Sequence, residues 1–93
     1  MAGPIRPVLP PHVAEAIRAL PPEIKRPVRE AIRALCLDPR LGQPLRGELT
    51  GMWKYRVRRY WIVYRVVASV LQVHAAGHRR DIYDHAARRR RSG

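Results

Sequence analysis

The sequence is poor in acidic residues and has no long apolar run. Only 7 of its 93 residues are Asp or Glu, against 19 Lys or Arg, so the formal net charge is +12 and the sequence pI is near 11.5. This imbalance predicts a polyanionic partner, either nucleic acid, a membrane surface or an acidic protein. No segment approaches the roughly 20 apolar residues of a membrane span, and the N-terminus lacks a signal-peptide pattern. We therefore expect a cytoplasmic protein that does not use a membrane.

Cysteine and phenylalanine are also scarce. Cys36 is the only cysteine, so no internal disulfide can form, and Phe is absent. One Cys and four scattered His do not predict a zinc site, and we expect neither a metal nor a small-molecule cofactor. The apolar setting of Cys36 predicts a small buried side chain rather than a nucleophile. The core must be built from Leu, Val, Ile, Ala, Trp and Tyr.

The basic residues are almost all arginine. Lysine occurs only as Lys25 and Lys54. Arginine makes planar, bidentate contacts with phosphate, which favours nucleic acid among the polyanions. A GC-rich genome would also replace Lys codons with Arg codons, and that bias explains the ratio but not the net charge.

The first half of the chain has a helical pattern. A length of 93 residues predicts one domain, spanning 1–93. Residues 4–9 form a possible edge strand, because their prolines remove the backbone donors that a central strand needs. Residues 11–37 carry apolar side chains at helical spacing, and the pattern is interrupted at Pro21-Pro22, so they predict a helical hairpin.

From residue 53 the apolar period changes to two. We expect an antiparallel sheet over residues 53–76, with residues 60–67 as its central strand and a short turn at Ala68-Ser69. Residues 77–93 form a basic C-terminal segment. The predicted fold is α+β, with an N-terminal helical hairpin packed on a small twisted antiparallel β-sheet. One sheet face should pack on the helices, and the other should carry the basic side chains.

Two groups of residues are candidates for chemistry. Lys54, Arg56 and Arg58 alternate along one strand, which predicts a row of cations with neighbours roughly 6.5 to 7 Å apart. Arg79 and Tyr83 follow the last strand, where a cation and an aromatic ring can contact a phosphate and a base. A solvated strand face explains the first group equally well, and docking of the C-terminal segment on the core explains Tyr83.

Several short motifs, taken in order, resemble those of the RelE/ParE superfamily of toxins from bacterial type II toxin–antitoxin systems. They are Leu-Arg-Gly at 45–47, Trp-Lys-Tyr-Arg-Val at 53–57, Tyr-Trp-Ile-Val-Tyr-Arg-Val at 60–66 and Gly-His-Arg-Arg-Asp-Ile-Tyr at 77–83. The last motif favours the RelE branch. The resemblance implies a microbial RNase-like fold, a cognate antitoxin, and cleavage of ribosome-bound mRNA by metal-free attack of the RNA 2′-hydroxyl.

The resemblance also assigns roles to individual residues. It implies that Lys54, Arg56, Arg79 and Tyr83 are catalytic, and we expect Arg46, Arg58, Arg65 and Arg80 to bind RNA. The sequence departs from the family pattern at Trp61, where an Arg usually follows the Tyr of the central strand. Two alternatives stay open: a ParE-like inhibitor of DNA gyrase without nuclease activity, and a catalytically silent RNA-binding domain.

Overall fold

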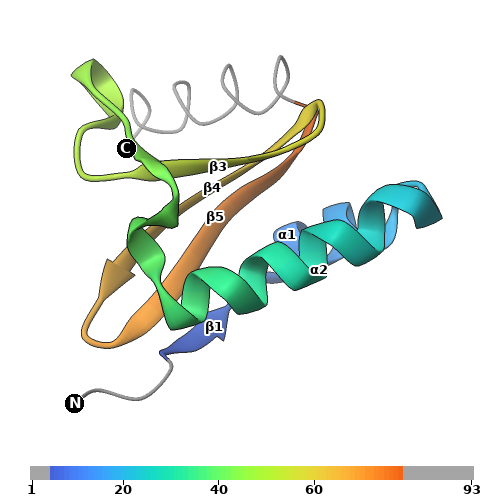
Figure 1. Ribbon diagram of the computed structural model, residues 1–93, viewed down its shortest axis with the longest axis horizontal. Coiled ribbons are helices and arrows are strands. Elements are labelled where there is room, and N and C mark those ends of the chain that lie inside the picture. Colours follow the sequence, from blue (N-terminus) through green and yellow to red (C-terminus); the bar gives the residue numbers. More distant parts are fainter. Residues whose placement is uncertain (1–4, 79–93) are drawn as a thin grey trace.

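The computed structural model describes residues 5–78, which form an α+β fold with two helices packed on a five-stranded mixed sheet (Figure 1). The predicted fold class is confirmed. In chain order the elements are β1 (Arg6–Val8), α1 (Pro11–Arg18), α2 (Pro22–Leu37), η1 (Pro39–Leu41), β2 (Gln43–Pro44), η2 (Gly47–Leu49), β3 (Trp53–Val57), β4 (Tyr60–Val67) and β5 (Val70–His78).

Proline begins both long helices. Pro11 and Pro22 occupy the first helical positions, where the missing N–H would have no partner within the helix. Pro10 and Pro21 precede them in extended backbone conformation, with ψ of 156° and 144°. Pro27 lies inside α2 without ending it, so the helix lacks one backbone hydrogen bond near its start. The predicted hairpin is therefore two helices joined at a proline break.

The sheet has the strand order β1-β5-β4-β3-β2. Strands β3, β4 and β5 form the predicted antiparallel meander, and the turn at Ala68 and Ser69 has positive φ at both residues, as a type I′ hairpin requires. The possible edge strand predicted at residues 4–9 is present as β1, but it pairs in parallel with β5, so the sheet is mixed and not purely antiparallel. Strand β2 was not predicted and forms the other edge beside β3. Strand β5 also extends two residues past its predicted end at residue 76, to His78.

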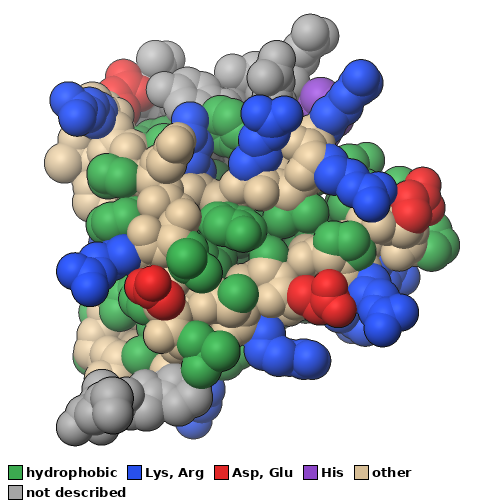
Figure 2. Space-filling model, viewed as in Figure 1, with side chains coloured by type: hydrophobic (Ala, Val, Ile, Leu, Met, Phe, Trp, Pro, Cys, Tyr) green, Lys and Arg blue, Asp and Glu red, His purple; other side chains and the backbone are tan. Residues whose placement is uncertain are grey.

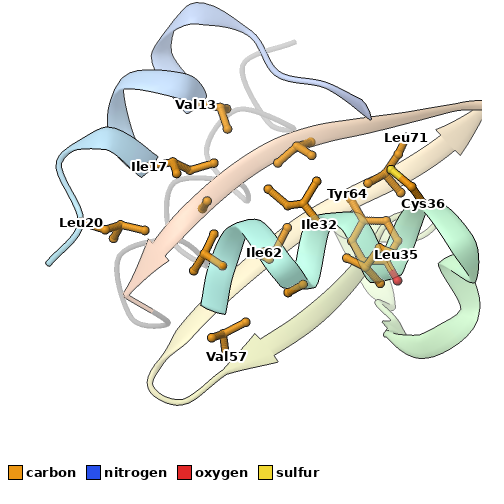
Figure 3. Close-up of a cluster of buried hydrophobic side chains, with 14 of the residues drawn as sticks. Val13, Ile17, Leu20, Ile32, Leu35, Cys36, Val57, Ile62, Tyr64 and Leu71 are labelled. Atoms are coloured by element: carbon orange, nitrogen blue, oxygen red, sulfur yellow. The ribbon is translucent and has the colours of Figure 1, made fainter. Parts of the chain in front are cut away.

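The larger core lies between the helices and one face of the sheet. Helix α1 contacts β5 and α2 contacts β3, and both helices lie on the same side of the sheet (Figure 1). In Figure 3, Leu35 and Cys36 of α2 lie beside Tyr64 and Leu71 of the sheet. Burial raises the pKa of the Cys36 thiol, as expected for a small buried side chain. No helix within residues 5–78 is long and apolar enough to cross a membrane.

The opposite face of the sheet is not only a basic surface, and that prediction needs correction. A second buried cluster occupies part of this face, with Trp61 packed against its edge; its members are Leu45, Leu49, Met52, Val63 and Ala75. The segment between β2 and β3 supplies the first three of these residues and covers this part of the sheet. The basic side chains therefore share the face with an apolar patch.

Strand β5 contains a β-bulge at His74. Val63 pairs with Ala75 but Tyr64 pairs with Val73, so His74 is an extra residue on β5. Such a bulge shifts the alternation of side chains by one residue. Val73 and Ala76 consequently both face the helices, and Ala75 belongs to the second cluster.

Candidate functional site

A pocket of about 370 Å³ lies where β3 and β4 meet the segment that follows α2. Strand β3 supplies Lys54 and Arg56, and β4 supplies Trp61. The rest of the lining is Leu41, Gly42, Gln43 and Tyr55. The pocket brings two cations, an indole ring and an amide together, which are the groups that bind a phosphate and a flat base.

Strand register sets the relative positions of these groups. Arg56 pairs with Trp61 across β3 and β4, and Lys54 pairs with Val63, two residues along β4. Lys54 is therefore a diagonal neighbour of Trp61 on the same face, within reach of a long side chain. The Lys54 Nζ atom lies 4.0 Å from the centroid of the Trp61 ring, which is a cation–π contact.

Arg56 and Arg58 do not form the predicted continuous row with Lys54. Arg58 lies in the β3–β4 turn with a φ of 57°, in the left-handed region, so the strand has ended before it. Its backbone carbonyl accepts a 2.7 Å hydrogen bond from Arg56 Nε. The structure therefore pairs Lys54 with Arg56 at the pocket, and Arg58 contributes a carbonyl that restrains the Arg56 guanidinium.

The two cations of the pocket have no carboxylate partner within residues 5–78. Figure 2 shows how strongly Lys and Arg outnumber Asp and Glu on the visible face of the molecule. Within the described part of the chain, no ion pair therefore offsets the attraction of Lys54 and Arg56 for an external anion.

Leu41, Gly42 and Gln43 form one wall of the pocket. This wall is held in place by Tyr64, whose side chain is fully buried. The Tyr64 hydroxyl donates a 2.6 Å hydrogen bond to the carbonyl oxygen of Pro39, at the start of the segment that leads to Gly42. Burial raises the pKa of Tyr64 to about 12; a hydrogen bond that the Gly42 backbone N–H donates to the hydroxyl opposes this rise, and nearby Asp38 adds to it. This phenol is thus a structural donor, tying the wall to the central strand.

Gly42 is required where this wall meets the sheet. A Cβ atom at this position would overlap the Tyr64 hydroxyl and would lie 2.5 Å from the backbone oxygen of Lys54. The close approach of these backbones allows Gly42 and Gln43 to line the pocket. The sequence marks this region only as a turn, so neither residue was expected at the site.

Arg46, Arg58 and Arg65 are not among the described residues that line this pocket. Arg46 is exposed at the start of η2, and Arg65 donates from Nε to Gln72 Oε1 at 3.2 Å on the neighbouring strand. The other three predicted residues, Arg79, Arg80 and Tyr83, lie outside the described residues. Within residues 5–78, no three His, Cys, Asp or Glu side chains group closely enough to hold a metal ion.

A larger pocket of about 460 Å³ lies between β1 and α2. Its lining is mostly apolar, with Ile5, Leu9 and Ile32 among the residues, and Arg29 and Arg33 of α2 at its side. None of the predicted site residues within 5–78 lines it. We therefore place the candidate site at the smaller pocket, where cations and an aromatic ring converge.

Comparison with protein families gives a match over most of the chain. Residues 12–83 match the family described as the ParE toxin of the type II toxin–antitoxin system, parDE. No curated protein matches the chain.

Solved structures give a consistent fold. A chain in the RelBE2 toxin–antitoxin complex from Mycobacterium tuberculosis is 28% identical, with a TM-score of 0.75 over 85% of this chain and 95% of that chain. A mutant of the E. coli toxin RelE in the free state has a TM-score of 0.76 at 20% identity, over 92% and 97% of the two chains. The isolated E. coli RelE toxin has a TM-score of 0.70 at 22% identity, over 91% and 97%. The two RelE likenesses establish a shared fold.

Proposed function

Because the chain belongs to the family of ParE toxins of type II toxin–antitoxin systems, within the RelE/ParE superfamily, we propose that it is a toxin of the RelE type that cleaves mRNA on the ribosome. The observation that carries the proposal is the pairing of Lys54 and Arg56 at one pocket without a carboxylate partner within residues 5–78. Two cations at one pocket suit a phosphodiester that gains negative charge as it reacts.

The proposed reaction is an attack of the RNA 2′-hydroxyl on the adjacent phosphorus. A base takes the 2′-proton, the P–O bond to the 5′-oxygen breaks, and an acid returns a proton to that oxygen. Lys54 and Arg56 stabilise the charge on the non-bridging phosphate oxygens. From the family resemblance we assign Arg79 to the transition state or the leaving group, and Tyr83 to stacking on the base.

We also propose two kinds of macromolecular partner. One is a cognate antitoxin, supported by the toxin–antitoxin complexes of M. tuberculosis RelBE2 and E. coli RelBE among the structures of similar fold. An acidic segment of the antitoxin would neutralise Lys54 and Arg56. The other is the ribosome with its mRNA, to which Arg46, Arg58, Arg65 and Arg80 would add affinity for phosphates without selecting a sequence.

Primer extension on a translated message tests the nuclease proposal. The purified chain should give discrete truncated products, and the Lys54→Ala/Arg56→Ala variant should cleave at least about 100-fold more slowly, on the scale of lost oxyanion donors. The control is Lys25→Ala/Arg29→Ala, which removes the same two residue types from α2, away from the pocket. It should cleave within about threefold of the parent chain. Equal losses in both variants would refute a specific role for the pocket.

A gyrase inhibitor is the second candidate function. It is favoured by the match to a ParE family and by Trp61, which stands where the resemblance leads one to expect Arg. An intact message together with inhibited DNA supercoiling by gyrase would assign the chain to this function. An intact message and active gyrase would favour an RNA-binding domain without catalysis.

A further inference from the structure

We propose that Trp61 is a positioning residue, whose indole face holds the Lys54 ammonium over the pocket beside Arg56. The role in catalysis rests on the proposed function, whereas the contact itself can be tested without it. The observation is the cation–π contact at 4.0 Å between Lys54 Nζ and the Trp61 ring, inside the pocket that both residues line.

The ring is held by packing on the apolar cluster beneath this face. Trp61 packs against the cluster that contains Leu49, Met52 and Val63, all nearly fully buried. A ring supported in this way has few accessible rotamers and offers a fixed surface. Packing on the second cluster therefore fixes the position of the ring, and the cation–π contact with the ring restricts the Lys54 side chain.

Among the described residues, only the face of the indole makes a polar contact, the one with Lys54. The Trp61 Nε1 atom is buried and has no hydrogen-bond partner among the described residues. A buried donor without an acceptor opposes folding, so hydrogen bonding within residues 5–78 gives no reason for a Trp at this position. The remaining contribution of the ring is its area and its negative quadrupole, which attracts a cation. Phe, which has a ring without the N–H, should therefore replace Trp61 in part, and Leu should not.

Holding Lys54 matters because a lysine side chain otherwise samples many rotamers. Lysine has a flexible four-carbon stem, and a phosphate contact must first restrict it. Arg56 is already restrained by its hydrogen bond to the Arg58 carbonyl. With Trp61 beneath Lys54, both cations are oriented before the ligand arrives, which is the condition for efficient stabilisation of a transition state.

The first test is NMR of the full chain after reductive ¹³C-dimethylation of its lysines, a change that keeps their charge. Only Lys25 and Lys54 carry a lysine ammonium, so Lys25 is an internal reference and Lys54→Ala assigns the second signal. Ring current should move the Lys54 methyl protons upfield of those of Lys25. Trp61→Phe should keep part of this shift, and Trp61→Leu should abolish it. A Lys54 signal at the Lys25 position in the unmutated chain would overturn the proposal.

The second test is a double-mutant cycle on the rate of mRNA cleavage at saturating ribosome concentration. Trp61→Leu should lower the rate about two- to fivefold, the change that corresponds to a cation–π contact at a partly exposed site. Trp61→Phe should restore most of it. In the Lys54→Ala background Trp61→Leu should have no further effect, because its target is gone. An equal loss in that background would show that Trp61 acts independently of Lys54 and would overturn the positioning role. Absence of cleavage in the parent chain would refute the proposed function, and the NMR result would then decide the contact alone.

Discussion

Replacing Tyr64 with Phe should destabilise the fold through the loss of the hydrogen bonds that its hydroxyl makes. The Tyr64 ring is fully buried in the main core, and Phe fills nearly the same volume, so the change leaves the packing intact. What it removes is the hydroxyl, which donates a 2.6 Å hydrogen bond to the Pro39 carbonyl and accepts one from the Gly42 backbone N–H. Both bonds connect the central strand to the segment that forms the pocket wall.

The size of the effect follows from two contributions. A typical intramolecular hydrogen bond stabilises a protein by about 0.5–1.5 kcal/mol, and an acceptor left without a partner adds a desolvation cost. Pro39 is only half-buried, so water can replace part of the lost contact. We therefore expect a loss of about 1–2 kcal/mol. Urea denaturation at pH 7 should show a midpoint lower by roughly 1 M with an unchanged slope.

The same variant should change how stability depends on pH. The pKa of Tyr64 rises from an ordinary value of 10.0 to about 12 in the folded chain, chiefly because of burial. The folded state thus binds this proton more tightly, and the resulting stabilisation is fully present below pH 10 and is lost as pH rises through about 12. The advantage of the parent chain over Tyr64→Phe should shrink across that window.

Two measurements can refute this reasoning. In absorbance titrations at 295 nm, the parent chain should show a late tyrosine ionisation near pH 12, and Tyr64→Phe should lack it. If the variant keeps the late step, the assignment of the raised pKa to Tyr64 is wrong. If the urea midpoint at pH 7 is unchanged, the hydrogen bond to Pro39 does not anchor the wall.

Two further substitutions test the packing around the same site. Gly42→Ala should destabilise the chain by about 1–3 kcal/mol, because the added Cβ would overlap the Tyr64 hydroxyl and the structure must shift. Thermal melts should show a lower Tm, and an unchanged Tm would contradict the close approach of Gly42 to Tyr64. Leu35→Ala should cost about 2–5 kcal/mol in urea denaturation, since Leu35 is fully buried between α2 and the sheet, and Leu37→Ala, at a side chain that is 71% exposed, should cost less than about 0.5 kcal/mol.

The helices and the meander could be predicted because their patterns are local. Val13 and Ile17 of α1 recur at helical spacing, and both are buried. The alternation from Trp53 to Val57 puts the aromatic side chains toward the helices, as the structure confirms. The spacing of apolar residues within one helix or strand shows which of its faces is apolar, and this spacing spans only a few residues.

The pairing partners of the two edge strands could not be predicted in the same way, although the prolines of residues 4–9 did predict an edge strand there. Strand β2 has two residues and β1 has three, which is too short for a period. Their positions depend on pairing with distant segments, β1 with residues 70–72 and β2 with residues 53–54. The bulge at His74 was not predicted, because one extra residue reverses the alternation of side chains and the sequence pattern does not mark where this happens.

The cover over the second sheet face also depends on distant contacts. Leu45, Leu49 and Met52 stand in a stretch that reads as a glycine-containing connection, with no helical or strand period. Each is buried because the connection folds back over β4 and β5. Period-two alternation shows that two residues share a face, but it does not show what packs on that face. The contact between Lys54 and Trp61 was missed for the same reason.

The correction at Arg58 bears on what the site can do. Extending the strand pattern through residues 54, 56 and 58 predicts three cations in line, which would suit a protein that follows a nucleic acid backbone over several phosphates. A single left-handed residue in the turn removes Arg58 from that line, and its carbonyl then restrains Arg56. What remains is two cations at one pocket, with a ring under one of them. This geometry concentrates positive charge at one point, where a single phosphodiester fits. A concentrated charge of this kind supports the proposal of cleavage at a defined bond over one of general binding along a strand.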